Sequence, residues 1–204
     1  PFSSPFDETA VELLESIDCP IYKIASLESG DLNLIKLVAE TGKPIIASTG
    51  ATTLQEIEEL VDVVRNTSSS DLTLLVCTSS YPASPQDANL RRIDFLKTHF
   101  GVKVGVSDHS LGIGVALAGI ALGATVIEKH LTLARSDGGA DGAFSMEPHE
   151  FGKLVSEGTD AFHSLGSSDW VDIPAEDESR SLRRSLYVVK EVVKGDLVTK
   201  ENVR

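Results

Sequence analysis

Apolar runs of five to nine residues recur along the chain, and a stretch with helical spacing separates each run from the next. Such runs, apolar on both faces and joined by single helices, are typical of a parallel sheet covered by helices. The pattern predicts strands at Pro20–Ser26, Lys43–Thr49, Leu72–Ser80, Val102–Asp108 and Thr125–Leu131.

The intervening stretches predict six helices. In the first, Val11, Leu13, Leu14 and Ile17 recur at helical spacing after Asp7, which we expect to be the N-cap. Glycines close three of the others. The remaining helices are predicted at residues 31–42, 53–66, 89–101, 111–123 and 147–165.

Polar residues follow every predicted strand, whereas the first strand is not followed by the GxGxxG fingerprint of an open nucleotide-binding sheet. A (β/α)8 TIM barrel builds its active site in this way, from the C-terminal ends of several strands, and needs about 250 residues. We count five full strands, and the segment PFSSPF resembles the end of an earlier one. We therefore expect an α/β fold, a TIM barrel that is incomplete at its N-terminus.

The character of the chain changes after the last predicted helix. Residues 167–182 are polar and acid-rich, as in a linker. Residues 183–204 contain a short β-rich stretch with a turn at Lys194 and Gly195. We expect a partial barrel domain at 1–166, a linker at 167–182, and the truncated start of a second domain at 183–204.

Composition excludes several classes of function. The net charge of −13 argues against nucleic acid and anionic membranes as partners. The sequence has neither an apolar run long enough to span a bilayer nor a signal-peptide pattern at its start, so we expect a cytoplasmic location. Cys19 and Cys77 lack CxxC spacing and are expected to be reduced, buried thiols.

His109 directly follows one predicted strand, and His130 lies near the end of the next. Neighbouring parallel strands lie about 4.8 Å apart, so two such imidazoles can reach one metal ion. By strand alternation, Ser107 shares the face of His109. Asp108 is expected to orient an imidazole without binding the metal itself. The alternative is that each histidine satisfies only local hydrogen bonds. The other histidines lie on predicted helices and are expected to be exposed: His99, His149 and His163.

Lys23 stands within an apolar strand, where a lysine is costly to bury unless an anion pairs with it. It can bind a carboxylate or phosphate, form a Schiff base, or extend to solvent. Strand alternation places Ser26 and Glu28 on the face opposite Lys23 unless a bulge intervenes. Lys129 is expected to pair on the outer face of the sheet.

Four serines can converge on an oxyanion together with Lys23, although a serine after a strand is often only a helix cap. The glycine-rich loop that carries Asp137 and Asp141 can close over a substrate or form an ordinary surface turn. The four serines are Ser4, Ser26, Ser48 and Ser107.

Seven segments in the same order resemble the sialic acid synthase family: PFSSPFD, YKIAS, GKPII, CTSSYPA, VGVSDHSLG, VIEKH and DGAFSMEP. The segments around SSYPA and GGADGAFSMEP are most similar to its pseudaminic acid synthase branch. The resemblance implies a synthase that condenses phosphoenolpyruvate with an acetamido sugar of the 2,4-diacetamido-2,4,6-trideoxy-altrose type and releases phosphate. It also implies a barrel followed by an antifreeze-like (SAF) domain.

The resemblance carries roles to individual residues. It places a divalent metal, Mn²⁺ before Mg²⁺ or Co²⁺, on His109 and His130, where it polarises the sugar aldehyde. It gives catalytic roles to Glu28, His109, His130 and Asp141. Ser79 departs from the asparagine of the neuraminate branch. The residues expected to hold substrate are Ser4, Lys23, Ser26, Ser48, Ser79, Tyr81 and Ser107.

Further expectations rest on the same resemblance. The family's catalytic glutamate and one phosphate-binding lysine are expected upstream of Pro1, and an arginine from the partner subunit beyond Arg204. A homodimer with swapped antifreeze-like domains is expected, while the isolated chain should bind metal weakly without turnover. The alternatives are an N-acetylneuraminate or legionaminic acid synthase, a metal-dependent aldolase, and, from another class, a noncatalytic sugar-binding barrel.

Overall fold

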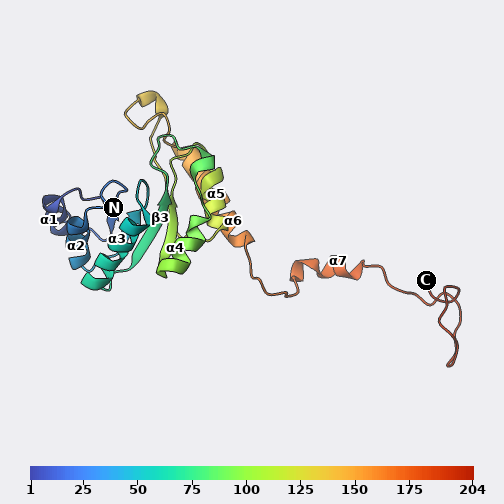
Figure 1. Cartoon of the computed structure of the whole chain (residues 1–204). Coiled ribbons are helices and arrows are strands. Elements are labelled where there is room, and N and C mark those ends of the chain that lie inside the picture. The colour runs from blue at the N-terminus through green and yellow to red at the C-terminus, as the bar shows by residue number, and fades with distance from the viewer. The chain divides into compact units, whose positions relative to one another are not determined.

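Helices and strands alternate in the first part of the chain (Figure 1). The computed structural model describes residues 1–204 and divides into two compact units, Pro1–Gly166 and Ser167–Arg204. The strands of the first unit are β1 (Tyr22–Ile24), β2 (Ile45–Ser48), β3 (Leu72–Cys77), β4 (Lys103–Ser107) and β5 (Ile127–Glu128). Its helices are α1 (Glu8–Ser16), α2 (Leu32–Glu40), α3 (Leu54–Thr67), α4 (Arg92–Phe100), α5 (Gly114–Ala121) and α6 (Pro148–Ser164), with short 3₁₀ turns η1 (Pro85–Asp87) and η2 (Arg135–Asp137).

The five strands form one parallel sheet in the order β1-β2-β3-β4-β5, so the predicted α/β class and parallel sheet are confirmed. The arrangement is a half-barrel in which each strand pairs with its neighbour in sequence. Beside β1, Ser3 forms a parallel bridge with Tyr22, and the amide of Lys23 donates to the Ser3 carbonyl. The segment before α1 therefore lies alongside β1, as expected for the end of a strand.

The register of the sheet separates a polar face from an apolar one. It aligns Cys77 with Ser107 and Ser107 with Glu128, while Lys23 and Ser48 lie an even number of rows earlier. Because side chains alternate between faces, these five residues share one face. The opposite face packs against the helices and supplies much of the hydrophobic core: Tyr22, Ile24, Ile45, Ala47, Leu72, Leu74, Val76, Val104 and Val106.

The first helix buries a narrower stripe than its sequence predicts. Asp7 caps α1, as expected, by accepting a hydrogen bond of 2.8 Å from the Ala10 amide. Val11 and Leu14 enter the core, but Leu13 is exposed, and so is Ile17, which is the C-cap. A helix on the outside of a sheet presents only one side to it, so two of the four apolar residues are buried and two are exposed.

The last strand is shorter than the predicted span of 125–131. Only Ile127 and Glu128 pair with β4, because β5 is the edge of the sheet. The chain beyond it pairs instead with the segment that precedes α6: the Met146 amide donates to the His130 carbonyl at 2.9 Å, and Leu131 bridges Met146. His130 is thus held by a bridge rather than by the strand itself.

The second unit has little regular structure. It contains η3 (Pro174–Glu176), α7 (Asp177–Ser181) and one antiparallel bridge, between Val188 and Val203. The turn at Lys194 and Gly195 is present, whereas α7 is a short helix within the segment expected to be a linker. No helix of the chain has the length and apolar character needed to cross a membrane.

Gly105 gives a test of sheet packing. A Cβ atom there would stand 2.4 Å from the Val126 carbonyl oxygen and 2.7 Å from Leu75 Cδ2. We expect Gly105→Ala to lower the free energy of unfolding by about 1–3 kcal/mol, because backbone must move to admit the methyl group. The measurement is the midpoint of urea denaturation.

The matched control is Gly152→Ala in α6, where a Cβ meets nothing within 4 Å. It should raise the free energy of unfolding by about 0.5–1 kcal/mol, since alanine favours a helix over glycine. Equal effects of the two variants would contradict the described packing around β4.

Candidate functional site

A buried lysine lies at the centre of the polar face. The Lys23 ammonium donates to the Ser48 hydroxyl and to the Ile24 carbonyl, each at 2.8 Å, and its side chain is almost wholly enclosed. Glu128 Oε2 lies 3.8 Å from Lys23 Nζ, and Glu128 Oε1 accepts from the Ser107 hydroxyl at 2.7 Å. The structure thus joins Lys23, Ser48 and Ser107 through Glu128.

Sequence interpretation missed Glu128. Its signal was the spacing of two residues from His130 on a predicted strand, which places both side chains on one face. The alternative in which Lys23 extends to solvent is wrong, because its side chain is buried and its ammonium donates to Ser48 and to the Ile24 carbonyl. Burial lowers the pKa of Lys23, and the nearby Glu128 carboxylate partly opposes that shift.

Ser26 reaches the same face although alternation along β1 predicted the opposite one. The strand ends at Ile24, so the period of two does not continue to residue 26. The Ser26 hydroxyl lies 3.4 Å from Cys77 Sγ and accepts from the Gly50 amide at 3.1 Å, while Ser79 Oγ is 3.9 Å from the same sulfur. No bulge is needed to bring Ser26 to the site.

Glycine is required where these groups meet. A Cβ atom on Gly50 would stand 2.3 Å from Ser79 Oγ, 2.8 Å from Ser26 Oγ and 2.9 Å from Cys77 Sγ. Cys77 is a free buried thiol, as expected, but it borders the site. Burial raises the pKa of this thiol, and hydrogen bonds with His109 and Ser26 outweigh burial, so that its net pKa is lowered.

The two imidazoles predicted to converge lie side by side. The ring centres of His109 and His130 are 5.2 Å apart, at an interplanar angle of 71°. His109 Nδ1 lies 2.9 Å from the Thr78 carbonyl oxygen, which can only accept, and His130 Nδ1 lies 3.5 Å from Asp141 Oδ2. Both rings are therefore oriented through Nδ1, which leaves each Nε2 without a hydrogen bond.

This arrangement fits one shared metal ion. Imidazoles that bind one ion through nitrogen bonds of about 2.1 Å have ring centres roughly 4 to 6 Å apart. No group of three or more His, Cys, Asp and Glu side chains that could hold a metal ion is present, so the two imidazoles are a candidate pair of ligands and not a complete site. Burial and the neighbouring His109 lower the pKa of His130, which favours the neutral ligand form.

The pKa of His109 shifts in the opposite direction to that of His130. Burial lowers the pKa of His109, but the hydrogen bonds with Cys77 and the Thr78 carbonyl outweigh burial and raise it overall. Because its pKa is raised, protons compete more strongly with a cation for His109 than for His130.

Asp108 does not orient an imidazole, so that prediction is wrong. Its carboxylate accepts from Lys129 Nζ at 2.8 Å and from the Ser110 amide and hydroxyl at 2.8 and 2.6 Å. Lys129 also donates to the Ser110 carbonyl at 2.8 Å. Alternation turns Asp108 to the helix side of the sheet, where the Lys129 ion pair secures the residues on both sides of His109.

Two aromatic side chains, Tyr81 and Phe144, lie beside the two imidazoles. Tyr81 has its ring centre 4.3 Å from that of His109 and 5.7 Å from that of His130. Phe144 lies 5.2 Å from His130 and 5.5 Å from Tyr81 between ring centres. Sequence interpretation missed Phe144, because its loop carried no pattern that specified which side chain turns inward.

Two predicted residues stand at the margin. Ser4 follows the Ser3 bridge to β1, which places it in register with Lys23. Glu28 has a buried Oε2 atom without a hydrogen-bond partner, and its charge acts on Lys23. Neither residue hydrogen-bonds through its side chain to another predicted site residue.

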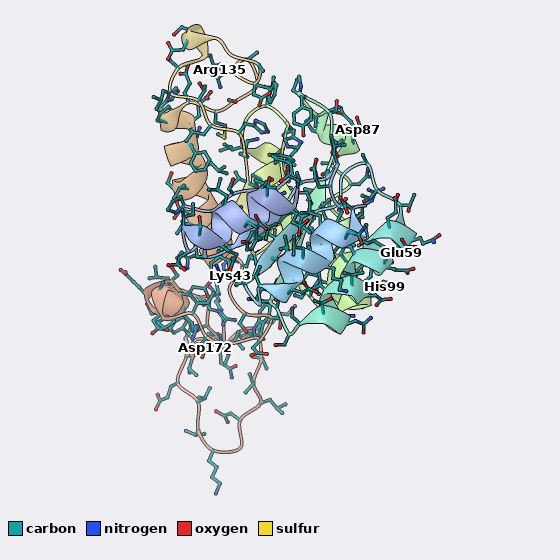
Figure 2. The ribbon with its side chains drawn as sticks, turned by 90° about the vertical axis from the view of Figure 1, so that its left-hand side faces the viewer. Lys43, Glu59, Asp87, His99, Arg135 and Asp172 are labelled. Carbon is teal, nitrogen blue, oxygen red and sulfur yellow. The ribbon has the colours of Figure 1, made fainter.

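The predicted exposed histidines lie away from this site. His99, His149 and His163 are exposed on α4 and α6. In Figure 2, His99 lies on the outer helical surface, whereas Arg135 and Asp87 mark loops that project from one end of the first unit. A separate apolar groove between α5, α6 and β5 contains none of the site residues; it is lined in part by Ile120, Ile127, Phe151, Leu154, Val155 and Phe162.

Comparison with known proteins places these residues in context. The family model described as NeuB family matches residues 1–169. A pseudaminic acid synthase of Helicobacter pylori is 41% identical over 204 residues, which cover 100% of this chain and 60% of that protein. An N,N'-diacetyllegionaminic acid synthase of Campylobacter jejuni is 37% identical over 206 residues, with coverage of 98% and 61%.

Solved structures agree with these relatives. The crystal structure of an N-acetylneuraminic acid synthetase from Leptospira borgpetersenii, in complex with citrate, superposes with a TM-score of 0.82 at 37% identity. The match covers 88% of this chain and 63% of that one. The chain thus spans about 60% of the length of the curated relatives it matches.

The Asp108–Lys129 pair, in which both side chains are only 2% exposed, gives a test of what secures His109. We expect Lys129→Met to lower the free energy of unfolding by about 3–5 kcal/mol, because it leaves a buried carboxylate without its cation. Urea denaturation measures the change.

Lys103→Met is the matched control. Lys103 forms an ion pair of 2.6 Å with Asp71, but both side chains are more than half exposed. Its removal should change the free energy of unfolding by less than about 1 kcal/mol. A Lys129→Met effect no larger than that of the control would show that the buried pair does not secure this part of the sheet.

Proposed function

The chain belongs to the NeuB family, and from this premise we propose that the complete protein condenses phosphoenolpyruvate with an acetamido sugar aldehyde. The products are a nine-carbon keto acid and inorganic phosphate, with one water consumed. We propose pseudaminic acid as the product, since pseudaminic acid synthases reach 41% identity. Legionaminic and neuraminate synthesis are the alternatives, because relatives of those kinds reach 39% and 37% identity.

The observation that carries the proposal is the position of the imidazole pair beside a buried cation. His109 lies two residues after β4 and His130 two residues after β5, and Lys23 with Ser48 lies on the polar face of the sheet. A carbonyl electrophile and a phosphorylated enolate donor need this combination. One site must polarise the carbonyl, and the other must hold an anion.

We propose that Lys23, Ser48 and Ser107 bind phosphoenolpyruvate, with Ser26 and Ser4 as further donors. The Lys23 ammonium supplies a charge-assisted hydrogen bond, and Ser48, which accepts from Lys23, keeps its own proton to donate. Ser107 donates to the anion when its hydroxyl turns away from Glu128. These groups explain how a chain of net charge −13 can accept an anionic substrate. Glu128 holds Ser107 in place through its 2.7 Å hydrogen bond.

His109 and His130 would hold the divalent ion, for which Mn²⁺ is the first candidate and Mg²⁺ and Co²⁺ are alternatives. When bound, the ion supplies Lewis-acid polarisation of the sugar aldehyde, so that C3 of phosphoenolpyruvate can form the new bond. The Thr78 carbonyl and Asp141 orient the two rings. Asp141, Tyr81, Ser79 and Glu28 are proposed to contact the sugar or the reacting carbons.

The remaining expectations extend the proposal to the whole protein. We propose that the half-barrel forms part of an (β/α)8 barrel, because β1 and β5 are both edges of the sheet. Residues 183–204 are proposed to begin an antifreeze-like domain. We also propose that the protein is a cytoplasmic homodimer, in which each antifreeze-like domain reaches the barrel of the other subunit.

Release of phosphate tests the reaction. The full-length protein, given Mn²⁺, phosphoenolpyruvate and a 2,4-diacetamido-2,4,6-trideoxy sugar, should release phosphate, and His130→Ala should lower kcat/KM by about 100-fold or more. The His130→Ala variant should also bind Mn²⁺ more weakly, as measured by isothermal titration calorimetry.

His99→Ala on α4 is the control and should leave turnover and Mn²⁺ binding unchanged. If the unaltered protein releases no phosphate with this sugar, the pseudaminic assignment falls. Release with N-acetylmannosamine instead would support the neuraminate alternative. If the His130→Ala variant binds Mn²⁺ as tightly as the unaltered protein, the proposed metal site is wrong.

Lys23 tests the anion site. Lys23→Gln should raise KM for phosphoenolpyruvate by roughly 10- to 100-fold and leave KM for the sugar unchanged, because a charge-assisted hydrogen bond is lost. Lys36→Gln, which alters only an exposed pair with Glu40, is the control. If Lys23→Gln leaves KM for phosphoenolpyruvate unchanged, Lys23 does not bind that substrate.

A further inference from the structure

Phe144 occupies a position in the candidate site that has no assigned role. Its ring centre lies 5.2 Å from that of His130 and 5.5 Å from that of Tyr81. Tyr81 in turn lies beside His109. Phe144 and Tyr81 therefore border the imidazole pair, and any molecule whose carbonyl reaches those imidazoles must pass close to both rings.

The loop that carries Phe144 is anchored at several points. The amides of Phe144 and Ser145 donate to the Asp141 carbonyl at 3.3 and 3.1 Å, and the Ser145 hydroxyl donates to the same oxygen at 2.7 Å. Asp141 itself lies against His130. Met146, two residues beyond Phe144, is buried and bridges Leu131. Phe144 is thus held between two attachments.

An arginine joins the start of this loop to its end. Arg135 Nε donates to the Ser145 carbonyl at 3.0 Å, its guanidinium pairs with Glu150, and its amide donates to Glu147 Oε1 at 2.9 Å. Gly142 admits no side chain, since a Cβ there would stand 2.4 Å from the Gly138 carbonyl oxygen. These contacts give the Phe144 ring a defined place, which selectivity between similar ligands requires.

The exposed surface of the two rings is apolar. Tyr81 is 53% exposed and Phe144 is half-buried, so both present ring surface to whatever occupies the mouth of the site. Aromatic rings pack well against methyl groups and C–H bonds and gain free energy when such groups displace water from them. A hydroxyl in the same place gains less, because it loses hydrogen bonds to water.

We propose that Phe144 determines sugar specificity: with Tyr81 it forms an apolar wall that receives the deoxy methyl group of the substrate. This assignment rests on the proposed function, since it describes the sugar side of the same site. It predicts a preference for diacetamido-trideoxy sugars over sugars that carry a hydroxymethyl group where the trideoxy sugar has a methyl group.

The test compares two sugars in the full-length protein with Mn²⁺. Phe144→Ala should lower kcat/KM for a 2,4-diacetamido-2,4,6-trideoxy sugar by about 10- to 200-fold, chiefly through the sugar KM. It should change kcat/KM for N-acetylmannosamine by less than threefold and leave KM for phosphoenolpyruvate unaltered. Phe144→Leu should retain most of the preference, because leucine keeps an apolar surface.

Saturation-transfer NMR gives a second readout that needs no turnover. Transfer from the unaltered protein should be strongest at the methyl protons of the trideoxy sugar, and Phe144→Ala should remove that excess. Phe95→Ala, an aromatic change on the outer side of α4, is the control and should leave both sugars unaffected. Circular dichroism melting checks that each variant folds.

The possible failures are distinct. Equal losses for both sugars in Phe144→Ala and Phe144→Leu, or a matching rise in KM for phosphoenolpyruvate, would overturn the specificity role while the proposed function stands. The absence of phosphate release from the unaltered protein with either sugar would overturn the proposed function and this assignment with it.

Discussion

A shift of one residue between neighbouring parallel strands would turn every side chain of a strand to the opposite face, and the candidate site depends on that constraint. The apolar row, with Tyr22, Leu74 and Val106, is buried against helices, so a slipped register would expose it. That burial fixes the other row as well. Lys23, Ser48, Ser107 and Glu128 share the polar face because their neighbours are committed to the core.

The polar face divides between two kinds of chemistry. On one side, Lys23 is buried and its ammonium is directed to hydroxyl and carboxylate partners, which suits an anion. On the other, two imidazoles present free Nε2 atoms, which suits a cation. Ser107 lies between them in the same row as Glu128. A buried cation needs compensation, and Glu128 supplies negative charge to Lys23 without hydrogen-bonding to either imidazole.

The strand ends hold their functional residues with contacts that lie outside the site. The buried pair of Asp108 and Lys129 secures the chain on both sides of His109 from the helix side of the sheet. The bridge from Leu131 to Met146 does the same for His130 and also sets the place of Phe144. The chemistry therefore depends on an ion pair and a bridge that would not touch a substrate.

The amino-acid sequence alone determined the α/β class, the parallel sheet, the approximate positions of the helices and the proximity of His109 to His130, because all of these follow from local periodicity and neighbouring strand ends. It also directed attention to Lys23. Only the tertiary structure decided that Ser26 joins Cys77, that Asp108 pairs with Lys129, and that Glu128 and Phe144 enter the site. Periodicity ends where a strand ends, and beyond that point the direction of a side chain is set by contacts between segments that are distant in sequence.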